Sequence, residues 1–177
     1  MQYMTHYTSP LGEITLASDG KAIIGLWFDG QKYDRSILLP ECQERELPIF
    51  TETKKWLDDY FAGKEPNFTP AIALDCSPFR REVLQILMDI PYGKTITYGE
   101  IAKELAKKRG LAKMSAQAVG GAVGYNPISL IIPCHRVVGT SGSLTGYSGG
   151  IQRKLALLQL EKVNMEKLFV PKKGTAL

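Results

Sequence analysis

Apolar residues follow a short period near the start of the chain and a longer period after it. Residues 12–28, GEITLASDGKAIIGLWF, place β-forming residues on both sides of Asp19-Gly20, a pair that favours a tight turn. Residues 47–61 instead carry apolar side chains near helical spacing, at Phe50, Trp56, Leu57, Tyr60 and Phe61. We therefore expect an antiparallel hairpin, followed by a helix that covers one face of its sheet.

The second half of the chain has the pattern of short helices with clear starts. Residues 62–78 are interrupted by prolines and lack a period, so they are expected to form an extended linker between two halves. Helices are then expected after Ser77, which precedes a proline, after Thr97, which forms a capping box with Glu100, and after Ser115. The helix after Ser115 consists almost wholly of small residues, so its backbone can approach another molecule closely.

Two of these helices are joined by the basic stretch LAKKRGLAKMS at residues 105–115. Two short helices joined by a turn in a basic context are typical of a helix-turn-helix. Ordinary helix packing, in which Gly120 and Gly121 merely let another helix approach, explains the same pattern. The pattern alone leaves both interpretations open.

The net charge of the chain changes sign near residue 76, where the predicted helices of the second half begin. The 177 residues carry a net charge of +4, but residues 1–76 carry −5 and residues 77–177 carry +9. A basic second half suits a polyanion, although solvated helix faces would also account for its lysines. Hydrophobic residues make up 44% and charged residues 23% of the chain, an ordinary composition for a globular protein.

The cysteines and the N-terminus bear on the compartment. Cys42, Cys76 and Cys134 are scattered and odd in number, which favours neither a disulfide framework nor a cysteine-rich zinc site. The first ten residues lack the pattern of a signal peptide, and no apolar run approaches a membrane span. We expect a cytoplasmic protein without a membrane segment.

Residues 130–139, LIIPCHRVVG, place reactive side chains inside an apolar run. Cys134 follows a proline and precedes His135 and Arg136, and such surroundings stabilise a thiolate. Side chains of neighbouring residues on a strand point to opposite faces, so His135 reaches the sulfur only if the backbone bends or a water bridges them. His6 is the only other histidine, so no zinc site is expected.

The motif IPCHRVVG, preceded by AVGGAVGYNP and followed by GYSGG and a helix, strongly resembles the O6-alkylguanine-DNA alkyltransferase family. The resemblance extends from about Ser77 to Glu161 and is less distinct before that. It implies an α/β protein with an RNase H-like domain at residues 1–73. A mainly helical, winged-helix-like (helix-turn-helix) domain is implied at 74–168, with a flexible tail at 169–177.

The resemblance also implies the chemistry. Cys134 corresponds to the cysteine that accepts the alkyl group from O6-alkylguanine, and also from O4-alkylthymine, in a single irreversible turnover. His135 corresponds to the base that acts through a water, and Glu161 to the carboxylate that orients it. Glu161 follows Leu157 and Leu158 by four and three residues, so it borders the apolar face of its helix and can point inward.

The other implied site residues hold the turn, the base or the DNA. Asn126 is expected to brace the turn, Tyr98 to contact a phosphate and protonate the leaving guanine, and Tyr147 and Ser148 to line the base pocket. Arg136, flanked by apolar residues, is expected to be paired internally. Further DNA or substrate contacts are implied for Ser115, Gln117, Ala118, Gly121 and Val137.

The implied partner is double-stranded DNA, entered from the minor groove with the damaged base flipped out. Gln117 stands where many members of the family have an intercalating arginine, and the N-terminal half lacks the Cys/His set that binds zinc in some relatives. We expect a monomer without a metal or other cofactor.

Two other functions stay open. A thiol hydrolase would use Cys134, His135 and a carboxylate in acyl transfer, with many turnovers. A non-enzymatic protein that senses DNA lesions would use only the helix-turn-helix, but such relatives lack the acceptor cysteine, which is present here as Cys134. Turnover distinguishes the first function, and an inert thiol the second.

Overall fold

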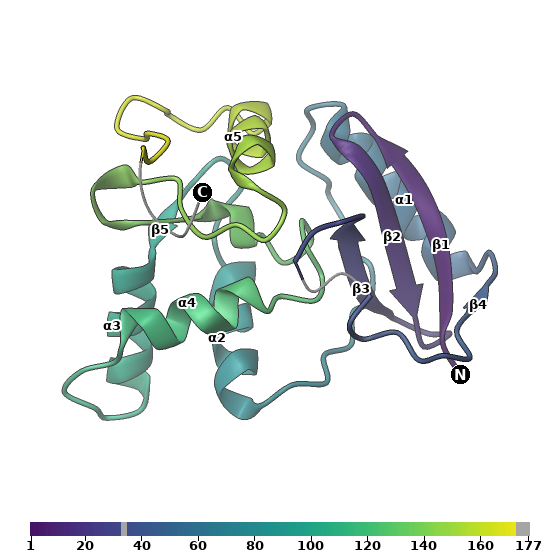
Figure 1. Cartoon of the computed structure of the whole chain (residues 1–177), viewed down its shortest axis with the longest axis horizontal. Helices are drawn as coiled ribbons and strands as arrows, with labels where there is room; N and C mark the ends of the chain where they lie inside the picture. The colour runs from purple at the N-terminus through teal and green to yellow at the C-terminus, as the bar shows by residue number, and fades with distance from the viewer. Residues whose placement is uncertain (33–34, 173–177) are drawn as a thin grey trace. The chain divides into compact units, whose positions relative to one another are not determined.

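The computed structural model describes residues 1–32 and 35–172 (Figure 1). The chain has a mixed α/β fold and divides into two compact units. The first comprises Met1–Asp75 with Pro127–Ile131, and the second comprises Cys76–Asn126 with Ile132–Leu177.

The first unit contains a four-stranded sheet in the order β3-β2-β1-β4. The strands are β1 (Tyr3–Ser9), β2 (Gly12–Ser18), β3 (Ile23–Phe28) and β4 (Gln43–Glu44). The pairs β1/β2 and β2/β3 are antiparallel, whereas β4 runs parallel to β1. The predicted hairpin is confirmed as β2 and β3, and Asp19 closes its turn by accepting the amides of Lys21 and Ala22, each at 2.9 Å.

The predicted helix is confirmed as α1 (Pro48–Phe61), which lies along one face of the sheet (Figure 1). Phe50, Leu57 and Tyr60 on α1 are fully buried, because residues three and four positions apart share one side of a helix. From the sheet, Ile14, Leu16, Leu26 and Phe28 are likewise 0% exposed. Burial of these side chains is the main stabilising contribution of this layer.

The free edge of β3 is covered by two further segments of the first unit. Ile23 exchanges backbone hydrogen bonds with Ala71 and Ala73, and Leu26 exchanges them with Pro127 and Ser129. The first segment lies within residues 62–78, the stretch predicted as a linker, and it forms a parallel bridge from Ile72 to Ile23. The second, Pro127–Ile131, leaves the sequence neighbourhood of the second unit to pair with β3, and nothing in its sequence indicates this.

The second unit holds four α-helices among its described residues: α2 (Pro78–Met88), α3 (Tyr98–Lys108), α4 (Ala116–Gly124) and α5 (Ile151–Leu160). A short parallel pair joins β5 (Ile96–Thr97) to β6 (Val137–Val138). Two 3-10 turns, η1 (Cys134–Arg136) and η2 (Thr140–Gly142), flank β6.

The predicted helix starts are confirmed. Ser77 accepts the amide of Arg80 at 3.3 Å, and Ser115 accepts that of Ala118 at 3.2 Å. Thr97 and Glu100 form both bonds of the capping box, at 3.1 and 2.9 Å. Each cap satisfies amides that the first helical turn leaves without an internal partner.

The strand β1 is not predicted by the pattern of apolar residues, because His6 and Thr8 interrupt that pattern. Of the tail expected at 169–177, Phe169 is hydrogen-bonded to Gly142 and Leu144, and residues 173–177 lie outside the described residues. Among the helices that the structure describes, none has the length and apolar character needed to cross a membrane.

Candidate active site

Cys134 and His135 lie on a tight turn rather than on a strand. They begin η1, in which the amide of Cys134 bonds to the carbonyl of Ile132 at 2.8 Å and that of Arg136 to Pro133 at 3.0 Å. Because the backbone bends here, both side chains are buried, with Cys134 6% and His135 0% exposed. A strand would have sent them to opposite faces.

Asn126 ties this turn to the end of α4. Its side-chain amide donates to the carbonyl of Ile132 at 2.8 Å, two residues before Cys134. Asn126 is 7% exposed, so the bond is protected from water. The geometry is that of a brace that fixes the backbone leading into Cys134.

His135 and Glu161 form a buried pair. The imidazole Nε2 lies 2.5 Å from Oε2 of Glu161, and both side chains are 0% exposed. With Nε2 donating its proton to the carboxylate, the neutral ring has its lone pair on Nδ1, which can then accept a proton. Glu161 thus selects the tautomer that makes His135 a base at its other nitrogen.

The second oxygen of Glu161 is also held. Oε1 accepts the amide of Gly93 at 3.0 Å and Nε of Arg136 at 2.8 Å, while Nη1 of Arg136 donates to the carbonyl of Ile90 at 2.7 Å. Arg136 is therefore paired internally, as its apolar neighbours in the sequence indicated. Glu161 follows α5 directly and is 2% exposed, so it points inward as its spacing predicted.

These contacts set the charges of the pair. Burial opposes ionisation of Glu161, but the hydrogen bonds and positive charge around it outweigh that effect and lower its pKa to about 2. Burial lowers the pKa of His135, against the opposing effect of Glu161. At neutral pH we therefore take Glu161 as ionised, with Arg136 as its counter-charge, and His135 as neutral.

Lys154 lies buried beside this site, and the sequence analysis did not single it out. The ammonium on α5 donates to the carbonyls of Val137 and Thr145, the latter at 2.8 Å. Burial lowers the pKa of Lys154 to about 8, and the nearby charge of Cys134 opposes that shift. A cation near the sulfur stabilises a thiolate. One signal was available: Lys154 shares the helix face of Leu157 and Leu158, where a lysine is unusual.

The two tyrosines lie near the sulfur and keep their protons. Burial and the charge of Cys134 raise the pKa of Tyr98 and that of Tyr147 above the ordinary range. The hydroxyl of Tyr98 donates to the carbonyl of Thr145 at 3.2 Å. The buried hydroxyl of Tyr147 has no hydrogen-bond partner among the described residues, and Ser148 donates to the carbonyl of Gly124 at 2.9 Å.

The structure places the remaining sequence-predicted residues on α4 and β6. Gln117, Ala118 and Gly121 are exposed on α4, and Ser115 caps that helix. Val137 is 0% exposed and offers its carbonyl to Lys154. Gly120 lies against Tyr98, since a Cβ at this position would lie 4.0 Å from the ring of Tyr98.

Metal ligands do not gather at this site or elsewhere in residues 1–32 and 35–172. No group of three or more His, Cys, Asp or Glu side chains in those residues could hold a metal ion. The polar groups at the site are a thiol, an imidazole–carboxylate pair, the buried Lys154 and the half-buried Arg136, which suit nucleophilic chemistry by the thiol.

Comparison with known proteins agrees with this chemistry. The methylated-DNA–protein-cysteine methyltransferase of Mycobacterium bovis is 43% identical over 164 residues, which are 90% of this chain and 93% of that protein. The protein of the same name from Haemophilus influenzae is 38% identical over 163 residues, 91% of this chain and 87% of its own.

A solved structure and two family models cover nearly the same residues. The crystal structure of Mycobacterium tuberculosis OGT in complex with DNA matches with a TM-score of 0.79 at 39% identity, over 90% of this chain and 92% of that one. The model described as the 6-O-methylguanine DNA methyltransferase ribonuclease-like domain matches residues 2–76, and the DNA binding domain of the same name matches residues 78–163. The chain therefore belongs to the 6-O-methylguanine DNA methyltransferase family.

Proposed function

We propose that this protein repairs DNA by transferring the alkyl group of O6-alkylguanine to the sulfur of Cys134, once per molecule. The observation that carries the proposal is a buried group of three residues: Cys134 adjoins His135, and His135 is hydrogen-bonded to an ionised Glu161. O4-alkylthymine, which presents the same kind of aryl ether, is a second substrate.

The reaction is a displacement at the alkyl carbon. The bond from sulfur to carbon forms as the bond from carbon to O6 of guanine breaks, and the electron pair of the broken bond stays with guanine. Nδ1 of His135 takes the proton of the Cys134 thiol through a water, and Glu161 holds the imidazole in the tautomer required. The charge of Lys154 favours the thiolate that results.

The departing guanine needs a proton. Tyr98 supplies it, because burial and the nearby charge of Cys134 raise its pKa and keep the phenol protonated at neutral pH. Tyr147 and Ser148 line the pocket for the flipped base, and the unpaired hydroxyl of Tyr147 is available to it. The thioether product is stable, so the protein is consumed.

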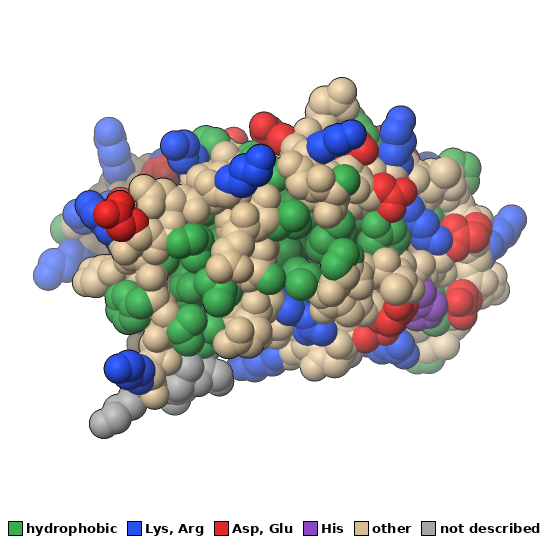
Figure 2. All heavy atoms as spheres, turned by 90° about the horizontal axis from the view of Figure 1, so that it is seen from above, with side chains coloured by type: hydrophobic (Ala, Val, Ile, Leu, Met, Phe, Trp, Pro, Cys, Tyr) green, Lys and Arg blue, Asp and Glu red, His purple; other side chains and the backbone are tan. Residues whose placement is uncertain are grey.

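DNA binds through α4, whose exposed Ala118 and Gly121 carry little bulk, so that the helix can enter the minor groove with Gln117. The second half carries a net charge of +9, which favours a polyanion. On the face seen in Figure 2, Lys and Arg side chains are scattered among other side chains and form no single patch. Because contacts to phosphates carry no direct information about the bases, binding driven by this charge is largely independent of base sequence.

The finer fold assignment follows the same family. We infer that residues 1–73 form the RNase H-like domain and residues 74–168 the winged-helix-like domain, in which α3 and α4 are the helix-turn-helix. We further infer that the protein acts as a monomer, since Cys134, His135 and Glu161 all belong to one chain. We infer that it works in the cytoplasm, where its three free cysteines stay reduced.

Stoichiometry tests the function. The protein is mixed with excess duplex containing O6-methylguanine, and its intact mass and cysteine peptides are measured. One methyl group should appear on the Cys134 peptide of each molecule, after which repair stops. Cys134→Ala should bind the duplex and transfer nothing. Several turnovers per molecule, as a thiol hydrolase would give, or methylation at Cys42 or Cys76 instead, would contradict the proposal.

A further inference from the structure

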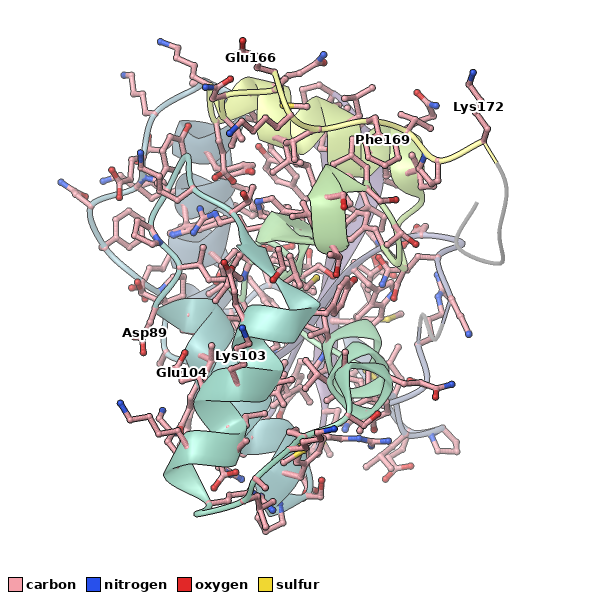
Figure 3. All side chains as sticks on the ribbon, turned by 90° about the vertical axis from the view of Figure 1, so that its left-hand side faces the viewer. Asp89, Lys103, Glu104, Glu166, Phe169 and Lys172 are labelled. Carbon is pink, nitrogen blue, oxygen red and sulfur yellow. The ribbon has the colours of Figure 1, made fainter. Side chains whose placement is uncertain are left out.

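The C-terminal segment, Met165–Phe169, follows residue 163, where the match to the DNA binding domain of the family ends. It lies in the second unit, and Figure 3 shows it with Phe169 above α3, which carries Lys103 and Glu104. The proposed reaction assigns it no task. Its contacts nevertheless lead towards the pocket for the base.

Backbone hydrogen bonds join the C-terminal segment to the loop after Cys134. The amide of Leu144 donates to the carbonyl of Phe169 at 2.9 Å, and the amide of Phe169 donates to the carbonyl of Gly142 at 3.0 Å. The two bonds make a parallel bridge between Ser143 and Phe169. The segment therefore adds a short strand to the pocket loop, which we define as residues 139–148.

Gly142 lets the two backbones approach closely. Its φ is +94°, and a Cβ added there would lie 1.9 Å from the carbonyl oxygen of Lys167. That distance is far inside van der Waals contact, so any side chain at this position would push the C-terminal segment away. The contact thus depends on glycine for two separate reasons.

Side chains seal the same contact. Leu144 of the pocket loop is 1% exposed in an apolar cluster with Val138 and Leu158. Met165 and Leu168 of the C-terminal segment pack against this cluster. If the C-terminal segment and the pocket loop separate, Leu144 is exposed to water. The cost of exposing this apolar side chain keeps the loop in place.

The next residue of the pocket loop, Thr145, is bonded to residues of the active site. The carbonyl of Thr145 accepts both the hydroxyl of Tyr98, at 3.2 Å, and the ammonium of Lys154, at 2.8 Å. Tyr147 and Ser148 follow at once. The loop is therefore anchored by the C-terminal segment at residues 142–144 and by site residues at 145.

We propose that the C-terminal segment determines which alkyl groups the protein accepts, by holding the pocket loop, and with it Tyr147 and Ser148, at a fixed distance from Cys134. The inference rests on the proposed function, in which those residues line the pocket. A fixed wall holds a methyl group in line with the sulfur, and it leaves less room for a larger group. Small losses of alignment reduce such displacements strongly, by roughly 100-fold for about 1 Å.

The test uses Gly142→Ala in the full chain, with Gly63→Ala as its matched control. Both glycines have positive φ, +94° and +81°, but a Cβ at Gly63 would meet nothing within 4 Å. The control therefore carries the backbone strain without the collision. Leu168→Ala, which loosens the packing without backbone strain, is a second variant in case Gly142→Ala does not fold.

Single-turnover rates are measured with duplexes carrying O6-methylguanine or O6-benzylguanine. In Gly142→Ala and Leu168→Ala, we expect the methyl rate to fall about tenfold or more and the benzyl rate to fall less, so that the ratio of the two decreases at least about threefold. Gly63→Ala should keep the ratio of the unaltered protein. Equal falls in both rates, or an unchanged ratio, would overturn the proposal.

Hydrogen exchange without DNA separates this inference from the function. The peptide containing Leu144 should exchange faster in Gly142→Ala and Leu168→Ala than in the unaltered protein, and equal exchange would overturn the proposal. If the unaltered protein transfers neither group, the proposed function fails, whatever the exchange of the loop shows.

Discussion

Replacing Arg136 with glutamine tests the charge arrangement that holds Glu161. The guanidinium of Arg136 donates a hydrogen bond to the carboxylate of Glu161 at 2.8 Å. It therefore places a full positive charge in direct contact with that carboxylate. Two unit charges about 4 Å apart attract by about 4 kcal/mol at an effective dielectric constant of about 20. Removing one partner of a buried pair costs about 3–5 kcal/mol, so Arg136→Gln should lower the free energy of unfolding by that amount at pH 7.

The loss should depend on pH in a defined direction. The folded-state pKa of Glu161 is about 2, below the value of about 4.3 for an unfolded chain. A lowered pKa stabilises the fold above pH ~4.3, and this stabilisation disappears as the pH falls towards 2. In Arg136→Gln the carboxyl of Glu161 should return to its ordinary pKa. The free energy of unfolding that this variant loses, relative to the unaltered protein, should then be about 2 kcal/mol smaller at pH 3 than at pH 7.

Chemical denaturation followed by far-ultraviolet circular dichroism, from pH 3 to pH 7, measures these differences. Arg109→Gln is the matched control, because Arg109 pairs with Glu82 at 2.7 Å but their side chains are 36% and 41% exposed. An exposed pair contributes only about 0–1 kcal/mol. The double variant Arg136→Gln/Glu161→Gln should recover part of the stability, since it no longer buries an uncompensated carboxylate.

Two results would refute the reasoning. One is a loss in Arg136→Gln no larger than that in Arg109→Gln. The other is a double variant no more stable than Arg136→Gln, which would mean that the guanidinium stabilises the fold through packing and its bond to Ile90 instead of through Glu161.

Three further predictions concern rate, DNA affinity and alkaline pH. Glu161→Gln should slow methyl transfer by about 100-fold or more in a mass-spectrometric time course, because a neutral amide in place of the carboxylate weakens His135 as a base; an unchanged rate would remove Glu161 from the reaction. Gln117→Arg should tighten duplex binding by about 1 kcal/mol and steepen its salt dependence, as measured by fluorescence anisotropy, whereas unchanged affinity would show that residue 117 does not meet DNA. The pKa of Lys154 is lowered to about 8, so the unfolded state binds more protons than the folded state between pH 8 and about 10.4. Over that range the free energy of unfolding of the unaltered protein should rise by about 3 kcal/mol relative to that of Lys154→Met. Equal changes in the free energy of unfolding of the two proteins with pH would contradict this.

Local patterns in the sequence were sufficient for the elements whose ends depend on neighbouring residues. The turn at Asp19-Gly20, the caps Ser77 and Ser115 and the box at Thr97 all form as predicted, because each requires only side chains within three residues of a backbone amide. The strand β1 was not predicted, because polar residues interrupt its apolar pattern. Its assignment depends on pairing with β2, which is a property of the sheet.

The active site divides in the same way. The adjacency of Cys134 and His135 is written in the sequence, and the family resemblance pointed to Glu161 as their partner. The folded chain alone shows that Arg136 and Gly93 share the second oxygen of Glu161 and that a lysine is buried at position 154. These contacts join residues 25 to 68 positions apart, or 17 for Lys154 and Val137, so no local period records them. Their energies arise from burial, which removes water from charges that would be screened on an open chain.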